Sequence, residues 1–377
     1  MSITFLHTAD WQIGKPFGEF SGDKPGVLRR ERLTAIDKIA GIARQRGAAH
    51  VLAAGDIFDF ETGSSLLVRQ LVQRLAGHRD VTWHLISGNH DPARASSVWE
   101  DVRAAAPPAN VVLHLEPVAA EIARGVVLLP APLKAKSCVS DPTAWMDHAA
   151  SPDGTIRIGL AHGSVTGFGS EGDAAVPIDP ARWRSAGLAF LALGDWHGTK
   201  KISDRVWYSG TPEPDCFADN EPGHILAVTL DSATAPPRVE RVRTATYSWL
   251  KREVPVIDAT GLDGIAGEIA ALGAEAQQHL VQLTLTGRAH LADRVAIEAR
   301  LAVLEASLFH LGSDLSRLTL VHDVTDIAAF GSGAVRAVAE RLSLQAASSD
   351  ERQSRVAAQA LLKLASLTTA TAKDAAA

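Results

Sequence analysis

Short apolar runs, punctuated by glycine and aspartate, recur along the chain between residues 3 and 230. Near-continuous apolar runs of this length are typical of strands that are buried on both faces. Between several of them the apolar positions recur with a helical period, as in 27–46, where Leu28, Leu33 and Ile36 share a face opposite a run of arginine and lysine. The pattern predicts an α/β fold with helices layered over sheets. The expected strands lie at 3–7, 50–54, 81–86, 111–115, 125–129, 156–161 and 188–193.

The pattern changes after residue 235. The segment 236–243 predicts a last strand and a linker. Beyond it, strand-like runs alternate with alanine-rich helical stretches, which predicts a small β-α-β-α-β unit. The strands of this unit are expected at 280–286 and 315–321, and its helices at 262–275 and 291–307.

The remainder of the chain is predicted to be helical. From Ser332 onward the helical pattern continues to the end, and the segments 324–342 and 356–367 carry faces of alanine, leucine and valine that suit contact with another helix. We expect the last residues, rich in alanine, threonine and serine, to fray. The expected segments are a first domain at 1–245, a capping domain at 246–322 and carboxy-terminal helices at 323–377.

Composition narrows the class of protein. The 377 residues are 46% hydrophobic and 21% charged, which is typical of a globular protein and excludes disorder or a fibrous repeat as the dominant class. The formal net charge of −6 argues against a protein that coats nucleic acid by bulk charge, but it leaves room for a local basic groove. Only two cysteines occur, Cys138 and Cys216, which fits a reducing compartment. Because the amino-terminal run reaches Asp10 too soon for a signal peptide or membrane span, we expect a cytoplasmic location and no membrane partner.

The candidate chemistry lies in five polar clusters, each at the carboxyl end of a predicted strand. In α/β sheets this is where ligands usually collect. Each cluster alone is a weak signal, because an aspartate after a strand usually caps a turn and a lone histidine is more often a hydrogen-bonded core residue. Coincidence is a poor explanation for all five in this order. The clusters are His7-Thr-Ala-Asp-Trp-Gln12, Gly55-Asp-Ile-Phe-Asp59, Gly88-Asn-His-Asp91, His162-Gly163 and Gly194-Asp-Trp-His197.

This ordered set resembles the calcineurin-like metallophosphoesterase superfamily, and within it the SbcD-like nuclease subunits of the DNA repair exonuclease branch. The opening Leu6-His-Thr-Ala-Asp-Trp, the block Gly55-Asp-Ile-Phe-Asp and the later stretch Tyr208-Ser-Gly-Thr-Pro all match that branch. The resemblance covers residues 1 to about 230. It implies an α/β fold, a sandwich of two mixed β-sheets flanked by helices, followed by a small α+β capping domain and carboxy-terminal helices.

The resemblance also implies a centre of two divalent metal ions. Carboxylate, imidazole and amide-oxygen ligands without a thiolate favour Mn²⁺, with Mg²⁺ or Fe²⁺ as alternatives. Two such ions can lower the pKa of a shared water and neutralise charge on both the attacking and the leaving oxygen at phosphorus. The implied ligands are Asp10, Gln12 and His197 for the first ion, Asn89, His162 and Asp195 for the second, and Asp56 as the bridge between them.

By its motif position, His90 would face the scissile phosphate. An imidazole has an unperturbed pKa of about 6.5, so it is suited to protonate the leaving oxygen as a general acid. Asp59 or Asp91 could orient the ligands without binding a metal ion themselves. His7 could have at most the same supporting role. Two cations, Lys15 and Arg94, lie close to these clusters in the sequence. Each either binds phosphate or is a surface charge.

Two clusters depart from the branch pattern. The branch has Asp-x-His where this chain has Asp10-Trp-Gln12, and Gly-His-x-His where this chain has Gly194-Asp-Trp-His197. One interpretation is decay into a non-catalytic subunit. We favour an active centre with a harder, more oxygen-rich metal preference, because Asp195 is still an anionic oxygen ligand and Gln12 still offers a carbonyl oxygen. The other motif residues are retained.

These expectations converge on a two-metal phosphodiesterase that cleaves DNA as an exonuclease or endonuclease in repair or recombination. In the resembled branch the region beyond the cap binds an SMC-like (SbcC-like) ATPase, so the segments 324–342 and 356–367 either dock on that partner or pack back on their own domain. A homodimer is usual in that branch. Two rival functions stay open: a phosphodiesterase or phosphatase for a small phosphate ester, and a catalytically weakened subunit that binds DNA ends or the ATPase.

Overall fold

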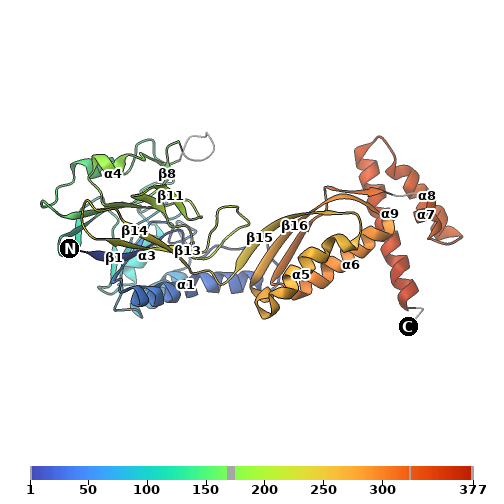
Figure 1. Cartoon of the computed structure of the whole chain (residues 1–377), viewed down its shortest axis with the longest axis horizontal. Helices are drawn as coiled ribbons and strands as arrows, with labels where there is room; N and C mark the ends of the chain where they lie inside the picture. Colours follow the sequence, from blue (N-terminus) through green and yellow to red (C-terminus); the bar gives the residue numbers. More distant parts are fainter. Residues whose placement is uncertain (1, 168–174, 322–323, 375–377) are drawn as a thin grey trace. The chain divides into compact units, whose positions relative to one another are not determined.

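The computed structural model describes residues 2–167, 175–321 and 324–374, and the chain divides into two compact units, Met1–Thr246 and Tyr247–Ala377 (Figure 1). The first unit holds all five polar clusters. The further boundary expected between residues 322 and 323 stays a prediction, because both lie outside the described ranges. Among the described residues, no helix is long and apolar enough to cross a membrane.

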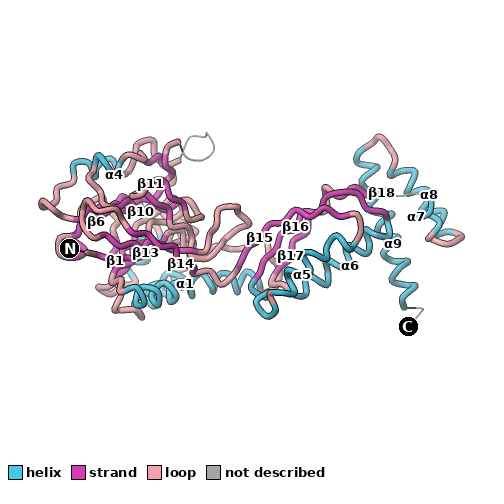
Figure 2. Tube along the Cα trace, in the orientation of Figure 1, coloured by secondary structure: helices cyan, strands magenta, loops and turns pink. Residues whose placement is uncertain are grey.

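Two six-stranded sheets form the framework of the first unit (Figure 2). In the first sheet four neighbouring strands run parallel, and two antiparallel strands extend it beyond β1. The parallel strands require crossover connections, which the helical stretches between the apolar runs supply. In spatial order the strands are β14 (Arg238–Arg243), β13 (His224–Leu230), β1 (Ile3–Thr8), β2 (His50–Ala53), β3 (Thr82–Leu85) and β4 (Val111–Leu113).

The second sheet has four central parallel strands and an antiparallel strand at each edge. The two sheets confirm the predicted pair of mixed sheets. A short separate pair is formed by β8 (Ser164–Val165) and β9 (Pro177–Ile178). In spatial order the second sheet contains β11 (Lys200–Ser203), β12 (Val206–Tyr208), β10 (Phe190–Gly194), β7 (Ile156–His162), β6 (Val126–Ala131) and β5 (Ala120–Ala123).

Buried apolar side chains arrange the first unit in layers. One core, which includes Phe5 and Phe190, draws on both sheets and lies between them. Another joins the opposite face of the first sheet to helices α1 (Lys24–Arg46), α2 (Ser65–Ala76) and α3 (Val98–Ala104). On the outer face of the second sheet, a third core includes residues next to the short helices η1 (Ala144–His148) and α4 (Arg182–Ser185). The expected layering of helices over sheet is therefore confirmed.

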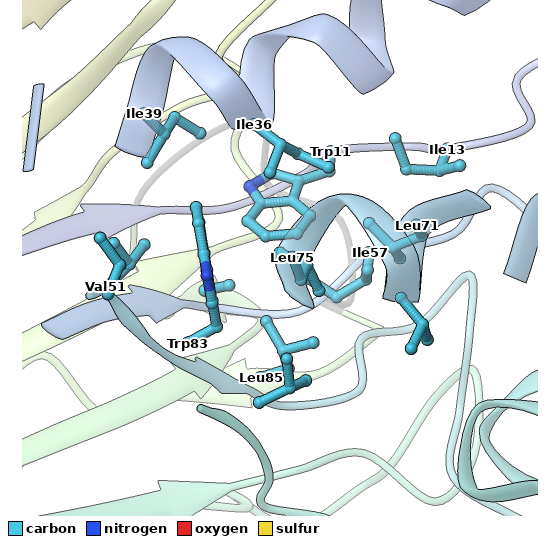
Figure 3. Close-up of a cluster of buried hydrophobic side chains, with 14 of the residues drawn as sticks. Trp11, Ile13, Ile36, Ile39, Val51, Ile57, Leu71, Leu75, Trp83 and Leu85 are labelled. Carbon is cyan, nitrogen blue, oxygen red and sulfur yellow. The ribbon is translucent and has the colours of Figure 1, made fainter. Parts of the chain in front are cut away.

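The core beneath α1 and α2 is built around two tryptophans (Figure 3). The rings of Trp11 and Trp83 meet edge to face, with centroids 5.9 Å apart and planes at 84°. Figure 3 shows Ile36 and Ile39 of α1 and Leu75 of α2 around these rings. Because the Trp83 ring is fully buried, its replacement by alanine is expected to lower the free energy of unfolding by about 3–5 kcal/mol. The packing of Trp11 anchors the loop that carries the first polar cluster.

Helix α1 corrects the sequence-based expectation in two respects. It begins at Lys24 rather than at residue 27, with Pro25 in the first turn, where a missing N–H does no harm. It ends at Arg46, as expected, and the next residue, Gly47, has a φ of 62°, the left-handed conformation that closes many helices. Its basic face is not wholly exposed, because Arg32 is buried and bonded to the loop of the first cluster.

A parallel sheet of four strands forms the base of the second unit. Helices α5 (Asp263–Ala271) and α6 (Leu291–Ser307) cover one face of it through a shared apolar core (Figure 1). Short helices η2 (Ala259–Leu262) and η3 (Gly273–Gln278) flank α5. The strand expected at 315–321 is confirmed by β18, which begins at Leu318, whereas β17, just before it, was not predicted. The strands are β15 (Ser248–Val256), β16 (His279–His290), β17 (His310–Asp314) and β18 (Leu318–Val321).

Three helices end the chain, and they pack back on their own unit. They are α7 (Val324–Ala328), α8 (Ala334–Ala346) and α9 (Glu351–Asp374). Their buried side chains, such as Leu361, contact Leu291 of α6. The helical backbone continues through Asp374, and residues 375–377 lie outside the described ranges, so the expected fraying of the tail stays a prediction. Large apolar side chains that stay exposed on α8 and α9 are Val335, Val338, Leu344, Val356 and Leu367.

Candidate active site

The five polar clusters follow the carboxyl ends of β1, β2, β3, β7 and β10, so the site draws on both sheets. Backbone hydrogen bonds join the loops. The N–H of Asp10 donates to the Gly55 carbonyl at 3.1 Å, and the N–H of Gly163 donates to the Gly194 carbonyl at 3.1 Å. Across the sheets, the N–H of Asp195 donates to a carboxylate oxygen of Asp10 at 3.1 Å. Strand ends that are far apart in sequence therefore form one loop cluster.

A metal-capable group lies at the centre of this cluster. Asp10, Asp56 and His162 each offer one ligand atom, and these atoms lie within 4.8 Å of one another. All three side chains are buried. The remaining nitrogen of His162, Nδ1, lies 2.8 Å from the Ala54 carbonyl oxygen, which holds the ring and directs Nε2 toward the carboxylates.

Asp56 contacts three other residues of the site, His90, His162 and Gln12. Its Oδ1 accepts from the backbone N–H of His90 at 2.9 Å and lies 3.4 Å from His162 Nε2. Its Oδ2 accepts from Gln12 Nε2 at 3.2 Å. The other amide atom, Gln12 Oε1, is buried without a hydrogen-bond partner. A buried, unused carbonyl oxygen on a side chain that contacts Asp56 is the kind of donor that a divalent cation accepts, so the residues present fit a metal centre.

Asn89 and Asp195 line the same group from β3 and β10. Asn89 Oδ1 lies 3.3 Å from His162 Nε2, and Asn89 Nδ2 lies 3.4 Å from Asp195 Oδ1. Ser164, which the sequence analysis did not single out, donates its hydroxyl to Asp195 Oδ2 at 2.6 Å. Its position two residues after His162 is the only sequence signal that could have drawn attention to it.

His197 belongs to a second chain of contacts. Its Nδ1 lies 3.0 Å from Asp215 Oδ1, and Asp215 Oδ2 accepts from Lys15 Nζ at 2.7 Å. Lys15 is thus engaged by a buried carboxylate rather than directed at the centre. Asp215 was missed by sequence reasoning, although it lies just beyond the Tyr208-Ser-Gly-Thr-Pro stretch. Its contact with His197 is the kind that orients a ligand ring.

Electrostatics set these groups apart from ordinary surface residues. Burial raises the pKa of Asp10 to about 6, although His197 and His162 oppose the shift. Burial disfavours a charged His162, but the carboxylates of Asp56 and Asp10 outweigh it and raise its pKa to about 9. The pKa of His197 also rises to about 9, against burial, because of its contact with Asp215 and the charge of Asp10. In the protein without metal, the positive charge of protonated imidazoles therefore offsets the negative charge of the carboxylates.

His90 differs from His162 and His197 because its side chain is half exposed. Its Nδ1 lies 3.3 Å from Asp59 Oδ1, and its Nε2 lies 3.9 Å from Asp56 Oδ2. The hydrogen bond with Asp59 raises the pKa of His90. The ring lines a cavity of about 440 Å³ together with Arg94. An imidazole with a raised pKa thus lies between the buried carboxylates and solvent.

Asp91 and His7 lie behind the site. Asp91 is buried and accepts from the N–H groups of Gly88 and Phe58, at 2.6 Å and 2.9 Å. Burial raises the pKa of Asp91 well above its usual range. His7 is also buried, its Nε2 lies 3.0 Å from the Leu193 carbonyl oxygen, and burial lowers its pKa to about 3. These two side chains shape the loops and the joint between the sheets.

The backbone of the site is strained. Asp10, Gln12, Asp56 and Asp195 have φ values of 53°, 50°, 51° and 101°, in the left-handed region that favours glycine. Such conformations cost of order 1–3 kcal/mol each and cluster at functional sites. Gly88 allows a close approach to a proposed ligand, because a Cβ there would lie 2.1 Å from Asp56 Oδ1.

Arg32 supports the strained loop from α1. Its guanidinium donates to the backbone carbonyls of Trp11 at 2.7 Å and Asp10 at 3.2 Å. It also donates to the Glu213 carbonyl at 3.0 Å, near Asp215 in the chain. One buried side chain therefore ties the first cluster to the segment that orients His197. No local motif marks Arg32, since it lies within a helix rich in arginine.

The comparison with protein families agrees with this geometry. Residues 3–179 match the family described as calcineurin-like phosphoesterase. The crystal structure of TT1561 of Thermus thermophilus is similar over 65% of this chain and 100% of its own, with 12% identity and a TM-score of 0.41. The comparison with curated proteins gives no match. The matched residues include Asp10, Asp56 and His162, so the part of the first unit that holds the metal-capable group is similar to calcineurin-like phosphoesterases.

Proposed function

We propose that this protein is a metal-dependent phosphodiesterase that cleaves DNA as an exonuclease or endonuclease, in repair or recombination. One observation carries the proposal. A buried group of oxygen and imidazole ligands meets the half-exposed His90 at the wall of a cavity that also contains Arg94. Phosphodiester hydrolysis needs these three elements: charge neutralisation, an acid for the leaving oxygen, and space for an anionic substrate.

The chain offers ligands for two ions. Asp10, Gln12 and His197 would hold one, Asn89, His162 and Asp195 the other, and Asp56 both. The unused Gln12 Oε1 and the close approach of Asp10, Asp56 and His162 support this assignment. Oxygen-rich donors favour Mn²⁺, with Mg²⁺ or Fe²⁺ as alternatives. When bound, such ions supply positive charge to the phosphate oxygens and acidify a water toward neutral pH.

His90 would act on the leaving group. When the phosphorus–oxygen bond breaks, the departing alkoxide needs a proton, and a positioned imidazolium can donate it. Asp59 holds the ring through Nδ1, which leaves Nε2 for that transfer, and the hydrogen bond with Asp59 raises the pKa of His90. The 3.9 Å separation from Asp56 keeps this proton close to the ligand group.

DNA as the substrate is supported by the motif resemblance to SbcD-like nucleases and by the cations of the cavity. The net charge of −6 means that attraction to DNA must be local. We further propose an SMC-like ATPase as partner in a cytoplasmic complex. The exposed apolar side chains that remain on α8 and α9, such as Leu344 and Leu367, support a second contact surface on helices that already pack on their own unit.

The test compares two substrates with Mn²⁺ or Mg²⁺. Linear and hairpin DNA are assayed beside bis-p-nitrophenyl phosphate, using the wild type and the Asp56→Ala and His90→Ala variants. We expect metal-dependent cleavage of DNA and of the small diester, and loss of both in Asp56→Ala. Cleavage of the diester without DNA would support an enzyme for small phosphate esters instead. No activity on either substrate, with or without the ATPase, would favour a DNA-end or ATPase-binding subunit.

A further inference from the structure

The cavity beside His90 has a wall that the ligand assignment does not use. Its volume of about 440 Å³ falls within the range of ordinary ligand pockets. Part of this wall comes from the loop after β2, which contributes Phe60 and Glu61. The rest includes Arg94, after the third cluster, and Lys136, beyond β6. Three loops that are far apart in sequence therefore converge next to the proposed general acid.

An ionic trio organises this wall. The Glu61 carboxylate pairs with Arg94 through one oxygen and with Lys136 Nζ at 2.7 Å through the other. The Glu61 side chain is only 17% exposed, whereas those of Arg94 and Lys136 are 57% and 69% exposed. The trio carries a net charge of +1, from two cations and one carboxylate. Glu61 thus gathers two cations that would otherwise repel each other, and holds them at the cavity.

The two cations keep most of their hydrogen-bonding capacity. A guanidinium has five N–H donors and an ammonium has three. Arg94 and Lys136 are directed to Glu61 through one nitrogen each, so several donors on each side chain remain available. A guanidinium fork matches phosphate geometry, and an adjacent ammonium adds a point charge. This combination recognises a phosphate group.

Phe60 supplies an aromatic surface at the same wall. Its ring is fixed on two sides, because a Cβ on Gly14 or on Gly63 would lie 2.3 Å from it. The ring also contacts Phe58, with centroids 5.4 Å apart. A ring held in this way loses little conformational entropy on contact with a ligand, and nucleic-acid bases stack on such rings.

We propose that this cavity binds the nucleotide next to the scissile phosphate, with Arg94 and Lys136 holding its phosphate and Phe60 stacking on its base. The inference rests on the proposed phosphodiesterase function and deepens it. It predicts a preference for oligonucleotides, which carry a phosphate on the neighbouring nucleotide, over small diesters, which do not.

The test uses the full chain with Arg94→Ala and Lys136→Ala combined. The matched control combines Lys134→Ala and Arg124→Ala. Lys134 is exposed and pairs with Glu116 much as Lys136 pairs with Glu61, and Arg124 is exposed, but neither lines this cavity. Lys136→Glu serves as a second variant, since it reverses a charge at an exposed position and should not disturb folding, which a thermal melt checks.

Two readouts separate the inference from the function on which it rests. The first is binding of a fluorescein-labelled oligothymidylate in EDTA, where we expect about tenfold weaker binding by the double variant. The slope of log Kd against log salt should fall by about 0.7, the value for one phosphate contact to a single strand. The second is kcat/KM with Mn²⁺ on the oligonucleotide, divided by kcat/KM on bis-p-nitrophenyl phosphate, which should fall about tenfold. The control should match the wild type in both.

The outcomes are distinguishable. The inference is overturned if the wild type cleaves the oligonucleotide and both the double variant and Lys136→Glu match it in binding and in the kcat/KM ratio. The trio of Glu61, Arg94 and Lys136 would then be a surface ion network only. If wild type cleaves neither substrate, the proposed function fails, whatever the binding result. Weaker binding and a reduced ratio in both variants, beside an unchanged control, support the nucleotide site.

Discussion

Two groups of histidines in the first unit have pKa values that shift in opposite directions. In the loop cluster, carboxylates raise the pKa of His162 and His197 to about 9. Between the sheets, burial lowers the pKa of His84 to about 3 and that of His114 to about 4. His84 forms the middle of a row, with Nε2 3.1 Å from His50 Nδ1 and Nδ1 3.0 Å from His114 Nε2.

The difference lies in the neighbours rather than in burial. His162 has Asp56 and Asp195 within 4 Å. The titratable groups that lower the pKa of His84 are other imidazoles. The first environment attracts cations, and a metal ion can take the place of its protons. The second keeps its rings neutral, as ordinary hydrogen-bonded core residues. A large number of histidines, 14 in this chain, therefore does not locate a metal site, but the carboxylates beside them do.

The largest effect is expected from Asp56→Asn. This change removes the carboxylate shared by Gln12, His90 and His162. The loss of metal affinity should exceed the roughly 10–100-fold typical for a group that only supports a ligand, and hydrolysis should fall below detection. Mn²⁺ binding by calorimetry and bis-p-nitrophenyl phosphate hydrolysis measure both. Asp204→Asn, at an exposed partner of Lys201, is the control. If Asp56→Asn bound Mn²⁺ with the wild-type stoichiometry, a neighbouring carboxylate would not be what distinguishes the histidines of a metal site from His84.

Next in size is His90→Ala. Loss of a general acid should lower kcat on DNA by about 10²–10⁴-fold. The loss should be much smaller on bis-p-nitrophenyl phosphate, because p-nitrophenolate leaves readily without a proton. The ratio of the two effects is the measurement, and metal binding should persist. Equal losses on both substrates would assign His90 to binding rather than to proton transfer.

Asp215→Asn should have a more moderate effect. Asp215 contacts the ring of His197 and pairs with Lys15, and despite its burial these contacts hold its pKa well below the usual range. Its neutralisation should lower metal affinity or activity by about 10–100-fold, and should lower the pKa of His197. Metal titration and histidine NMR measure these two effects. Glu116→Gln, at an exposed carboxylate, should change neither, and an unchanged His197 titration in Asp215→Asn would contradict the orienting role.

The smallest effect is expected in the row of neutral histidines formed by His50, His84 and His114. Because the folded pKa of His84 lies below its unfolded value of about 6.5, the unfolded chain binds more protons as the pH falls. The free energy of unfolding should therefore drop between pH 7 and pH 5, with about 2 kcal/mol of that drop due to His84. In His84→Leu the drop should shrink by this amount, whereas exposed His148→Leu should leave it unchanged. Urea unfolding in EDTA at both pH values measures it. An equal drop in all three proteins would mean that the row does not titrate on unfolding.

The fold was largely predictable because its determinants are local. Apolar runs of four to seven residues gave the strands around the site, and polar clusters after them indicated where the strands end. The start of α1 was less certain, since Lys24 and Pro25 precede the apolar periodicity. The run at 315–321 contains β18, but β17 was missed because its five residues include one large apolar side chain, Leu311.

The candidate site was predictable only as a set of motifs. Sequence could suggest that Asp10, Asp56 and His162 meet, because each follows a strand, and the structure brings them within 4.8 Å. It could not suggest Arg32 or Asp215, whose roles depend on contacts between segments about 180 residues apart in the chain, such as Arg32 with Glu213. Their local sequence is that of a basic helix or a surface loop. The roles proposed for the ligands, His90 and Arg94 stay predictions.

The left-handed residues of the loop cluster bear on engineering. At Asp10, Gln12, Asp56 and Asp195, glycine would relieve strain, so a screen that rewarded thermal stability alone would favour exchanging these side chains. Each exchange would remove a proposed ligand. Stabilising substitutions in this protein should therefore be sought away from the loop cluster, and a more stable variant with glycine at these positions should be a poorer enzyme.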